Sequence, residues 1–168
     1  TKTVQSSVAV LDGVADPLKN ARFLFRNILF GFKTLLTVLK HRGVPDPDGQ
    51  VMGRVFVGGV RCYLLQEQRD GREEKDMIDL FTNIFIDLQP ETFHEVFATH
   101  MPFLFDEILR APMLLGIPQN LLSNDAVSRR FVEILFKFLV ARLDELGTAD
   151  KKMASVTLRL FKMAFMAV

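Results

Sequence analysis

The stretch that decides the fold is "PLKNARFLFRNILFGFKTLLTVLKHRG", from Pro17 to Gly43. Its apolar side chains recur three and four positions apart, the spacing that places them on one face of an α-helix. They are Phe25, Ile28, Leu29, Phe32, Leu35, Leu36 and Leu39. Asp16 precedes Pro17 as a capping residue and Gly43 follows the last basic residues, so both ends carry helix boundary signals. The sequence therefore predicts one long helix over 17–42.

The apolar face of this helix is wider than a single packing surface requires. Three further large apolar residues lie beside the main stripe: Phe23, Leu24 and Phe30. A helix at the surface of a globule needs only one apolar stripe toward the core. We therefore expect this helix to be packed on two sides.

The same helical spacing continues after residue 70. It runs through "EEKDMIDLFTNIFIDL" (73–88), "ETFHEVFATHMPFLFDEILRAP" (91–112) and "AVSRRFVEILFKFLVARLDEL" (126–146). Pro102 predicts a kink or a break in the second of these segments. The third has capping choices in Ser123, Asn124 and Asp125, and Gly147 is expected to end it. Thr148 or Asp150 is expected to start a last helix.

The segment "QVMGRVFVGGVRCYLL", residues 50–65, leaves two interpretations open. Its valines and glycines favour a strand by propensity, whereas Met52, Val55, Phe56, Val60 and Leu64 outline a helical stripe. Its glycines are Gly53, Gly58 and Gly59. No Gly-Lys-Ser/Thr follows them, and their spacing fits neither common phosphate-binding fingerprint. We favour glycines that let two helices approach closely.

These segments predict an all-α chain of about seven helices without an internal domain boundary in 1–168. The turn-rich "VPDPDG" marks a loop at 43–50 between two helical hairpins. Short links between amphipathic helices fit either a compact bundle or an α-solenoid of HEAT-like antiparallel hairpins. We favour the solenoid, because several helices are apolar on more than one face. The absence of a starting Met and the apolar final turn "FKMAFMAV" also lead us to expect a piece of a longer protein.

Composition narrows the classes of partner. The chain has sixteen Phe but no Trp and one Tyr, which suits buried packing better than base stacking. Its net charge of +1 gives no overall attraction to nucleic acid or to anionic lipid. No apolar run approaches the length of a membrane span. Cys62 is the only cysteine, which favours a reducing compartment. We expect neither direct nucleic-acid binding nor membrane binding.

The motif "HEVFATH" comes close to a zinc-protease signature. That signature needs two histidines four residues apart, because such residues share one side of a helix and can bind one ion. Here His94 and His100 are six apart, which turns them about 120° away from each other on a helix, and Ala98 holds the position of the second ligand. We predict no metal site here.

No other set of residues predicts catalysis. The histidines, His41 among them, have no cysteine or motif-bearing serine nearby. Three pairs of adjacent acids occur on predicted helices: Glu73–Glu74, Asp106–Glu107 and Asp144–Glu145. Adjacent helical residues do not face one another, so these are interpreted as solvated faces. The sequence predicts no enzyme and no cofactor.

One charged pattern suggests a binding surface. Arg22, Arg26, Lys33 and Lys40 are spaced 4, 7 and 7 residues apart, which puts them on one stripe of the long helix. Such a basic row could steer an acidic, partly disordered partner whose aromatic side chains dock nearby. The alternative is a solvated face that keeps the helix soluble.

From residue 17 onward the chain resembles the TRRAP family of transcription-associated pseudokinase scaffolds. The resemblance is carried by 91–147, by "SVTLRLFKMAFMAV" at the end, and by "EEKDMIDLFTNIF" and "NARFLFRNILFGFKTLL". It rests on extended similarity and includes no short catalytic motif. The departure from the family is the glycine-rich "VPDPDGQVMGRVFVGGV", where a plainer helix is expected.

The resemblance implies a scaffold shared by SAGA-type and related histone acetyltransferase complexes. It implies that this piece lies in the N-terminal HEAT-repeat region, that the protein is nuclear and lacks kinase activity, and that the helical repeats receive acidic transcription activators and sister subunits. Two rivals remain. One is the helical-repeat arm of an active kinase of the same superfamily, and the other is a compact free-standing helical enzyme.

Overall fold

The long helix predicted from the opening stretch is α2, Pro17–Arg42. The computed structural model describes residues 17–42, 49–64 and 71–168, and every regular element in these ranges is helical. After α2 come α3 (Gln50–Leu64), α4 (Gly71–Ile86), α5 (Pro90–Arg110), α6 (Gly116–Ser123), α7 (Ser128–Ala141) and α8 (Lys151–Met166). Two 3₁₀ turns, η1 (Pro112–Leu115) and η2 (Leu143–Glu145), lie between them. The all-α prediction is confirmed, and the ambiguous glycine-rich segment is helical.

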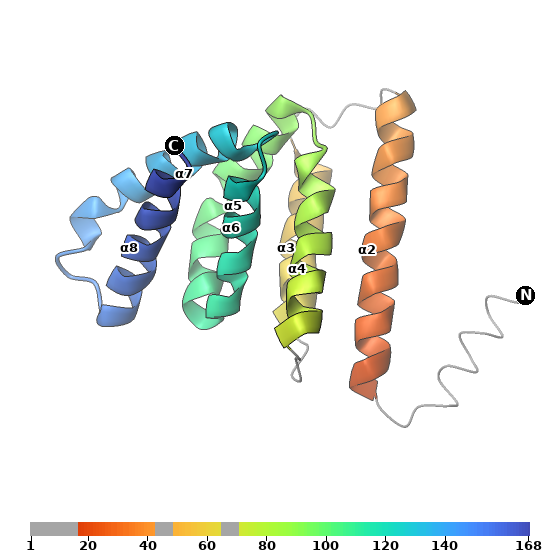
Figure 1. Cartoon of the computed structure of the whole chain (residues 1–168), viewed down its shortest axis with the longest axis horizontal. Coiled ribbons are helices and arrows are strands. Elements are labelled where there is room, and N and C mark those ends of the chain that lie inside the picture. Colours follow the sequence, from red (N-terminus) through yellow and green to blue (C-terminus); the bar gives the residue numbers. More distant parts are fainter. Residues whose placement is uncertain (1–16, 43–48, 65–70) are drawn as a thin grey trace, which may run out of the picture.

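The helices stack as two layers. In one layer α3 packs against α5 and α5 against α7, while in the other α2 packs against α4 and α4 against α6. α8 closes the row with contacts to α5, α6 and α7. Figure 1 shows this order, from α2 on the right to α7 and α8 on the left. The predicted HEAT-like solenoid is therefore the observed architecture.

The core is built from phenylalanine rings that join four helices, α3, α4, α5 and α7. Phe56 of α3 is fully buried, with ring centroids 5.8 Å from Phe81, 5.4 Å from Phe85 and 5.3 Å from Phe97. Phe97 continues this contact to Phe131 of α7 at 5.5 Å. Each fully buried side chain of this size contributes about 1.5–3 kcal/mol of transfer free energy. The abundance of Phe thus holds successive helical pairs together.

Two of the three glycines in α3 lie at close helix–helix contacts. A Cβ on Gly53 would collide with the imidazole of His100 on α5, and a Cβ on Gly59 would collide with the ring of Phe81 on α4. Gly58 is exposed, with nothing within 4 Å of the Cβ position. The predicted close approach is confirmed for Gly53 and Gly59 but not for Gly58. All three lie inside a helix, so the phosphate-loop alternative does not fit.

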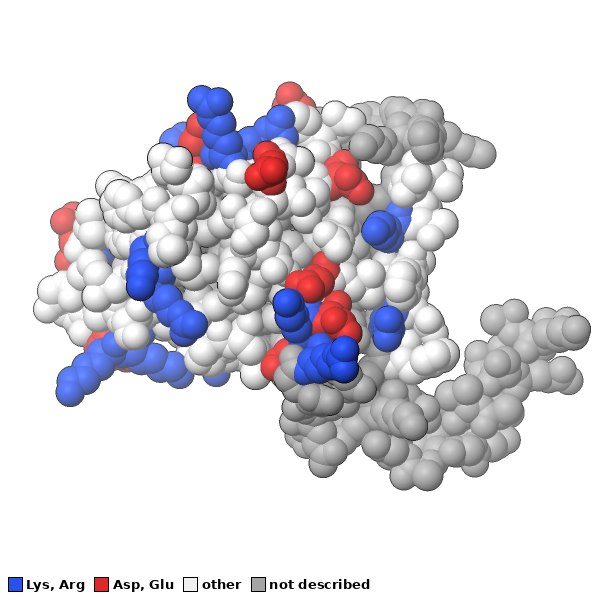
Figure 2. Space-filling model, viewed as in Figure 1, with Lys and Arg blue, Asp and Glu red and all other residues white. Residues whose placement is uncertain are grey.

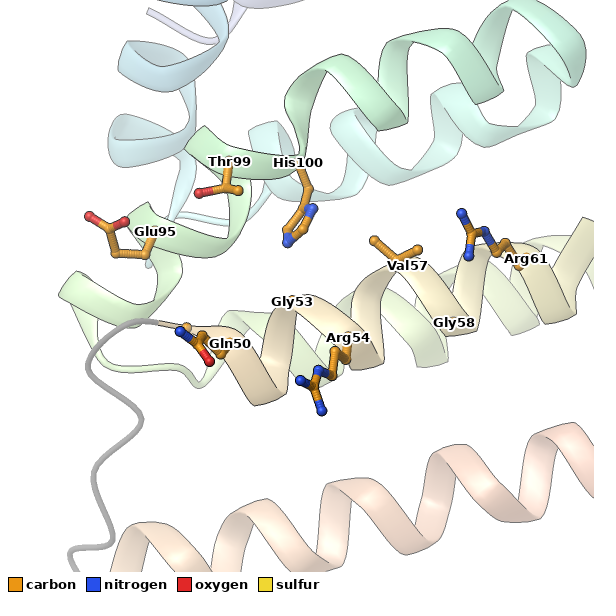
Figure 3. Close-up of a pocket in the computed structure, with 10 residues that line it drawn as sticks. Gln50, Gly53, Arg54, Val57, Gly58, Arg61, Glu95, Thr99 and His100 are labelled. Carbon is orange, nitrogen blue, oxygen red and sulfur yellow. The ribbon is translucent and has the colours of Figure 1, made fainter.

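Pro102 lies inside α5 without ending it. The helix changes direction near Thr99 and His100, as Figure 3 shows. Proline lacks the N–H that would bond to the carbonyl four residues earlier, and its ring crowds that carbonyl. The predicted outcome, a kink or a break, is here a kink.

Two helix boundaries differ from the sequence prediction. The segment predicted to reach Gly147 leaves the α-helical conformation at Ala141 and continues as η2. The same segment begins at Ser128, because Asn124 instead accepts a hydrogen bond from the Ala126 N–H (3.0 Å) and holds a turn before the helix. Sequence reasoning also assigned no helix to α6.

The loop prediction falls mostly outside the described residues. Residues 43–48 of the predicted 43–50 loop, and the capping residue Asp16, are among those the structure does not describe. Gly49 ends the loop with a φ of 60°, a conformation that favours glycine, and α3 starts directly after it. The extent of the segment as one unit over 1–168 stays a prediction.

Large apolar side chains remain exposed at both ends of the row. On α2, Phe25 and Leu29 are buried toward the rest of the protein, whereas Phe23, Leu24 and Phe30 are 59%, 62% and 47% exposed. On α8, Leu158 and Phe165 are 62% and 67% exposed. The described residues therefore cover one side of α2, and the second side that the sequence predicted to be packed is open.

Candidate functional site

The two histidines of "HEVFATH" lie in different surroundings. His94 is exposed, whereas the ring of His100 lies against Gly53 and 6.3 Å from the ring of Phe56. Burial lowers the pKa of His100 below its usual 6.5, because desolvation disfavours the charged imidazolium. Within the described ranges, no group of three or more His, Cys, Asp or Glu gathers where it could hold a metal ion.

One acid of each of the three adjacent pairs, Glu74, Glu107 and Glu145, makes a local interaction, and the side chain of Glu73 lies outside the described residues. Glu107 is buried and its Oε1 lies 3.2 Å from the Arg110 guanidinium, while its neighbour Asp106 is exposed. Glu74 accepts a 2.7 Å hydrogen bond from the Tyr63 hydroxyl, which ties the end of α3 to the start of α4. Glu145 lies 3.4 Å from Arg142. These are structural contacts between a carboxylate and a donor, not carboxylates that face one another.

The predicted basic row runs along α2. Arg26 and Lys33 are exposed, and the Arg26 guanidinium lies 5.8 Å from the centre of the Phe30 ring. The side chains of Arg22 and Lys40 lie outside the described residues. The sequence of α2 contains no Asp or Glu, so its surface charge is of one sign. Figure 2 shows basic side chains on the column of atoms that α2 forms at the right.

Sequence reasoning missed a groove between α3 and α5. It has a volume of about 520 Å³ and combines residues from two helices. The α3 side contributes Gln50, Gly53, Arg54, Val57, Gly58 and Arg61, and the α5 side contributes Glu95, Thr99 and His100. In Figure 3, the His100 ring points toward α3 near Gly53, and Val57 points from α3 toward α5. Gly49 lines one end.

Two arginines dominate the charge of this groove. Arg54 and Arg61 are exposed, and neither has an ion-pair partner among the residues that the structure describes. The Arg61 guanidinium lies 5.7 Å from the centre of the Phe103 ring on α5. The signal that could have revealed the site is the spacing of Arg54, Gly58 and Arg61 on one stripe of a helix that contains no acid.

The described helices give no sign of a membrane segment. None of them combines the length and the apolar character that crossing a bilayer requires.

Comparison with known proteins identifies the family. The sequence profile described as the Tra1 HEAT repeat central region matches residues 1–168. It thus covers the whole chain, including the glycine-rich segment that departed from the expected pattern. The profile describes the central part of the repeats, whereas the resemblance had implied the N-terminal part.

Individual relatives agree with this match. The chain is 26% identical to the SAGA complex/NuA4 acetyltransferase complex subunit Tra1 of Schizosaccharomyces pombe, over 91% of this chain and 5% of that protein. It is 31% identical to the Saccharomyces cerevisiae subunit TRA1, over 58% of this chain and 3% of that protein.

A human relative extends the comparison beyond fungi. The chain is 32% identical to the human transformation/transcription domain-associated protein, over 69% of this chain and 3% of that protein. The chain thus spans only a small part of the length of the relatives that it matches. With the family profile covering every residue and the helices stacked as HEAT-like pairs, this chain belongs to the Tra1/TRRAP family, within its central HEAT-repeat region.

Proposed function

We propose that this chain is a non-enzymatic scaffold segment of a histone acetyltransferase coactivator complex of the SAGA or NuA4 type. The observation that carries the proposal is the match of the entire chain to the Tra1 HEAT-repeat family. Two yeast relatives are named as subunits of the SAGA and NuA4 complexes. A stacked helical array suits this role, because it offers an extended surface built from rigid repeats.

The partners proposed for this segment are acidic transcription activators and sister subunits of the complex. The acidic partner is proposed to meet the basic row of α2, defined by Arg22, Arg26, Lys33 and Lys40. Arg26 and Lys33 are exposed, and no acid on α2 opposes their charge. Exposed Phe23 and Phe30 lie on the same helix, where aromatic side chains of a steered partner can pack. The proposed location is the nucleus, which membership of such a complex supports.

The rival role is the helical-repeat arm of a catalytically active kinase of the same superfamily. The Tra1 match favours the scaffold. The two roles differ in the kinase-like domain of the full-length protein. The scaffold role requires that domain to lack the catalytic Asp or the metal-binding Asp, and the presence of both would support the kinase.

Charge reversal tests the activator-binding role. The variant Arg22→Glu, Arg26→Glu, Lys33→Glu and Lys40→Glu is compared with wild type for pull-down of an acidic activation domain. We expect at least about a tenfold loss of bound partner, because four attractive charge contacts become repulsive. Circular dichroism is expected to be unchanged, since surface charges such as Arg26 and Lys33 contribute little to the fold.

A matched control distinguishes the effect of the basic row from the effect of a change in total charge. Arg129, Arg130, Lys151 and Lys152 are exposed on α7 and α8, and their reversal to Glu makes the same change in total charge. The control is expected to retain binding. If the α2 variant captures as much activation domain as wild type, the row is not the activator surface.

A further inference from the structure

The geometry points to a second docking site: the groove between α3 and α5 takes one face of an acidic helix whose two carboxylates lie seven residues apart and meet Arg54 and Arg61. This site is separate from the basic row of α2. The inference rests on the proposed function only in taking the chain to be a docking scaffold. The partner of this second site is a helix, and its two acids have a defined spacing.

The charge of the groove selects an acidic partner. Arg54 and Arg61 are exposed on a helix without any acidic residue, and neither has an ion-pair partner within the described ranges. In Figure 3 Arg61 points toward α5, whereas Arg54 points away from it and has to turn toward the groove to meet a partner. Among the described residues, Glu95 is the one acid that lines the groove, and it lies with Gln50 near the first turn of α3 (Figure 3). Arginine presents a planar fork of donors that suits a carboxylate. Two arginines against one Glu leave a net attraction for acids.

The spacing of the two arginines selects a helix. Arg54 and Arg61 are seven residues apart, which corresponds to about 10.5 Å along α3 at about 1.5 Å per residue. On a partner helix that runs alongside, residues seven apart repeat at the same distance on the same face. An extended partner advances about 3.3 Å per residue and turns successive side chains to opposite faces. Its residues three apart match the distance but point in opposite directions.

The floor between the arginines permits close approach. Gly58 lies between them on the same stripe, is exposed, and has no atom within 4 Å of its Cβ position. Val57 and His100 lie beside it, so the middle of the groove offers apolar and aromatic contact between the two charged positions. A volume of about 520 Å³ accommodates side chains from one face of a helix. The matching partner therefore carries an apolar side chain midway between its two acids.

A designed peptide tests this site directly. The probe is a labelled, capped, alanine-rich helical peptide with two Glu seven positions apart and one Leu between them on the same face. A second peptide has the same composition with its two Glu five positions apart, which places them on opposite faces. A third replaces both Glu by Lys. Fluorescence anisotropy with the 168-residue chain measures the affinity of each.

We expect the first peptide to bind at least about tenfold more tightly than the second, because only its two acids reach both arginines. The variant Arg54→Glu with Arg61→Glu should bind the first peptide more weakly by a similar factor. The same variant should bind the Lys peptide more tightly than wild type does. Reversal of Arg129 and Arg130 on α7 is the matched control and should change neither affinity. Equal binding of the first two peptides, or failure of the first to bind wild type, overturns the inference.

Gly58 offers a steric test that leaves the charge unchanged. Gly58→Leu places a side chain in open space, so the fold is retained while the groove between the arginines is filled. We expect binding of the first peptide to fall by about tenfold or more with unchanged circular dichroism, and Gly58→Ala to retain most of it. If Gly58→Leu binds as wild type does, the helix does not sit in this groove.

Binding of the first peptide by the two charge-reversal variants distinguishes the two proposed sites. If the α2 variant loses the first peptide while the Arg54 and Arg61 variant retains it, the inference fails and the basic row is supported. If the two variants behave in the opposite way, the groove is supported independently of the row.

Discussion

Gly58 and Gly59 are neighbours in the sequence with opposite surroundings in the fold. Open space surrounds the Cβ position of Gly58, whereas that of Gly59 is filled by the buried ring of Phe81. Alanine is the better helix former, since glycine loses more backbone freedom on folding. The same substitution should therefore change stability in opposite directions at adjacent positions.

We predict that Gly58→Ala raises the free energy of unfolding by about 0.5–1 kcal/mol. Gly59→Ala should lower it by about 1–3 kcal/mol, because α3 and α4 must separate or Phe81 must leave its packed position. Urea denaturation followed by circular dichroism measures both variants side by side. Equal effects of the two substitutions would show that α3 does not pack on α4 as described.

His100 gives the protein a pH-dependent contribution to stability. Burial lowers its pKa in the folded state, so the unfolded state binds a proton more readily. The contribution of His100 to the free energy of unfolding should be complete above its ordinary pKa of 6.5. It should decrease as the pH falls from 6.5 toward the lowered pKa of the folded state. The decrease reflects protonation of an imidazole that the fold holds neutral.

The prediction is checked by urea titrations on both sides of pH 6.5. His100→Gln should reduce the pH dependence of stability, since glutamine does not titrate. His94→Gln, at an exposed position on the same helix, should leave the dependence as in wild type. A slope that survives in His100→Gln would assign the effect to other groups.

At the scale of elements, α8 depends on a single side-chain cap. Asp150 accepts a 2.7 Å hydrogen bond from the Met153 N–H at the first turn of α8. The carboxylate satisfies one of the free N–H groups there and also interacts favourably with the helix dipole. The sequence left Thr148 and Asp150 as alternatives, and the structure selects Asp150.

We predict that Asp150→Ala lowers the free energy of unfolding by about 0.5–2 kcal/mol. Asp150→Asn should lose only part of this, because its side-chain oxygen still accepts the Met153 N–H. Hydrogen exchange of the first-turn amides of α8 measures the local effect. Unchanged exchange in Asp150→Ala would contradict the capping role.

At the scale of the whole molecule, the two ends of the row expose apolar side chains. Phe23 and Leu24 on α2 and Leu158 and Phe165 on α8 are each more than half exposed. Large apolar side chains that stay in contact with water favour association with another surface. A helical array gains its stability from contacts between neighbouring repeats. End faces that no repeat covers therefore tend to associate with other apolar surfaces.

We predict that the isolated 168-residue chain self-associates as its concentration rises. Leu24→Glu combined with Leu158→Glu should reduce the association, because charges replace apolar contact on both end faces. Sedimentation velocity measures the change, and circular dichroism checks that the helices persist. As a control, Lys152→Glu changes an exposed polar position on α8 and should leave association as in wild type. A monomeric wild-type chain at every accessible concentration would contradict the prediction.

The sequence by itself determined most of the helical segments and the buried stripes of α5 and α7. The stripes expected on α2 and α8 are only partly buried, because Ile28, Leu158 and Phe165 are exposed. Regular spacing of Phe and Leu identified α2 and most later helices, because helical periodicity is a local property of the chain. The resemblance carried by 17–168 implied the family. The short helix α6 was not predicted, because Gly116 and Pro118 are typical of a turn. Its apolar residues pack against α4 and α7, and this tertiary packing is not visible in the local sequence.

Only the tertiary structure decided what meets across helices. The α3–α5 groove joins Arg54 and Arg61 to Glu95 and His100, and no local pattern states that these two helices are neighbours. The difference between Gly58 and Gly59 likewise depends on how α3 is rotated against α4. Periodicity fixes the buried face of each helix, but the register between helices is set by the interlocking of their side chains. The binding surfaces therefore follow from packing, whereas the helices follow from spacing.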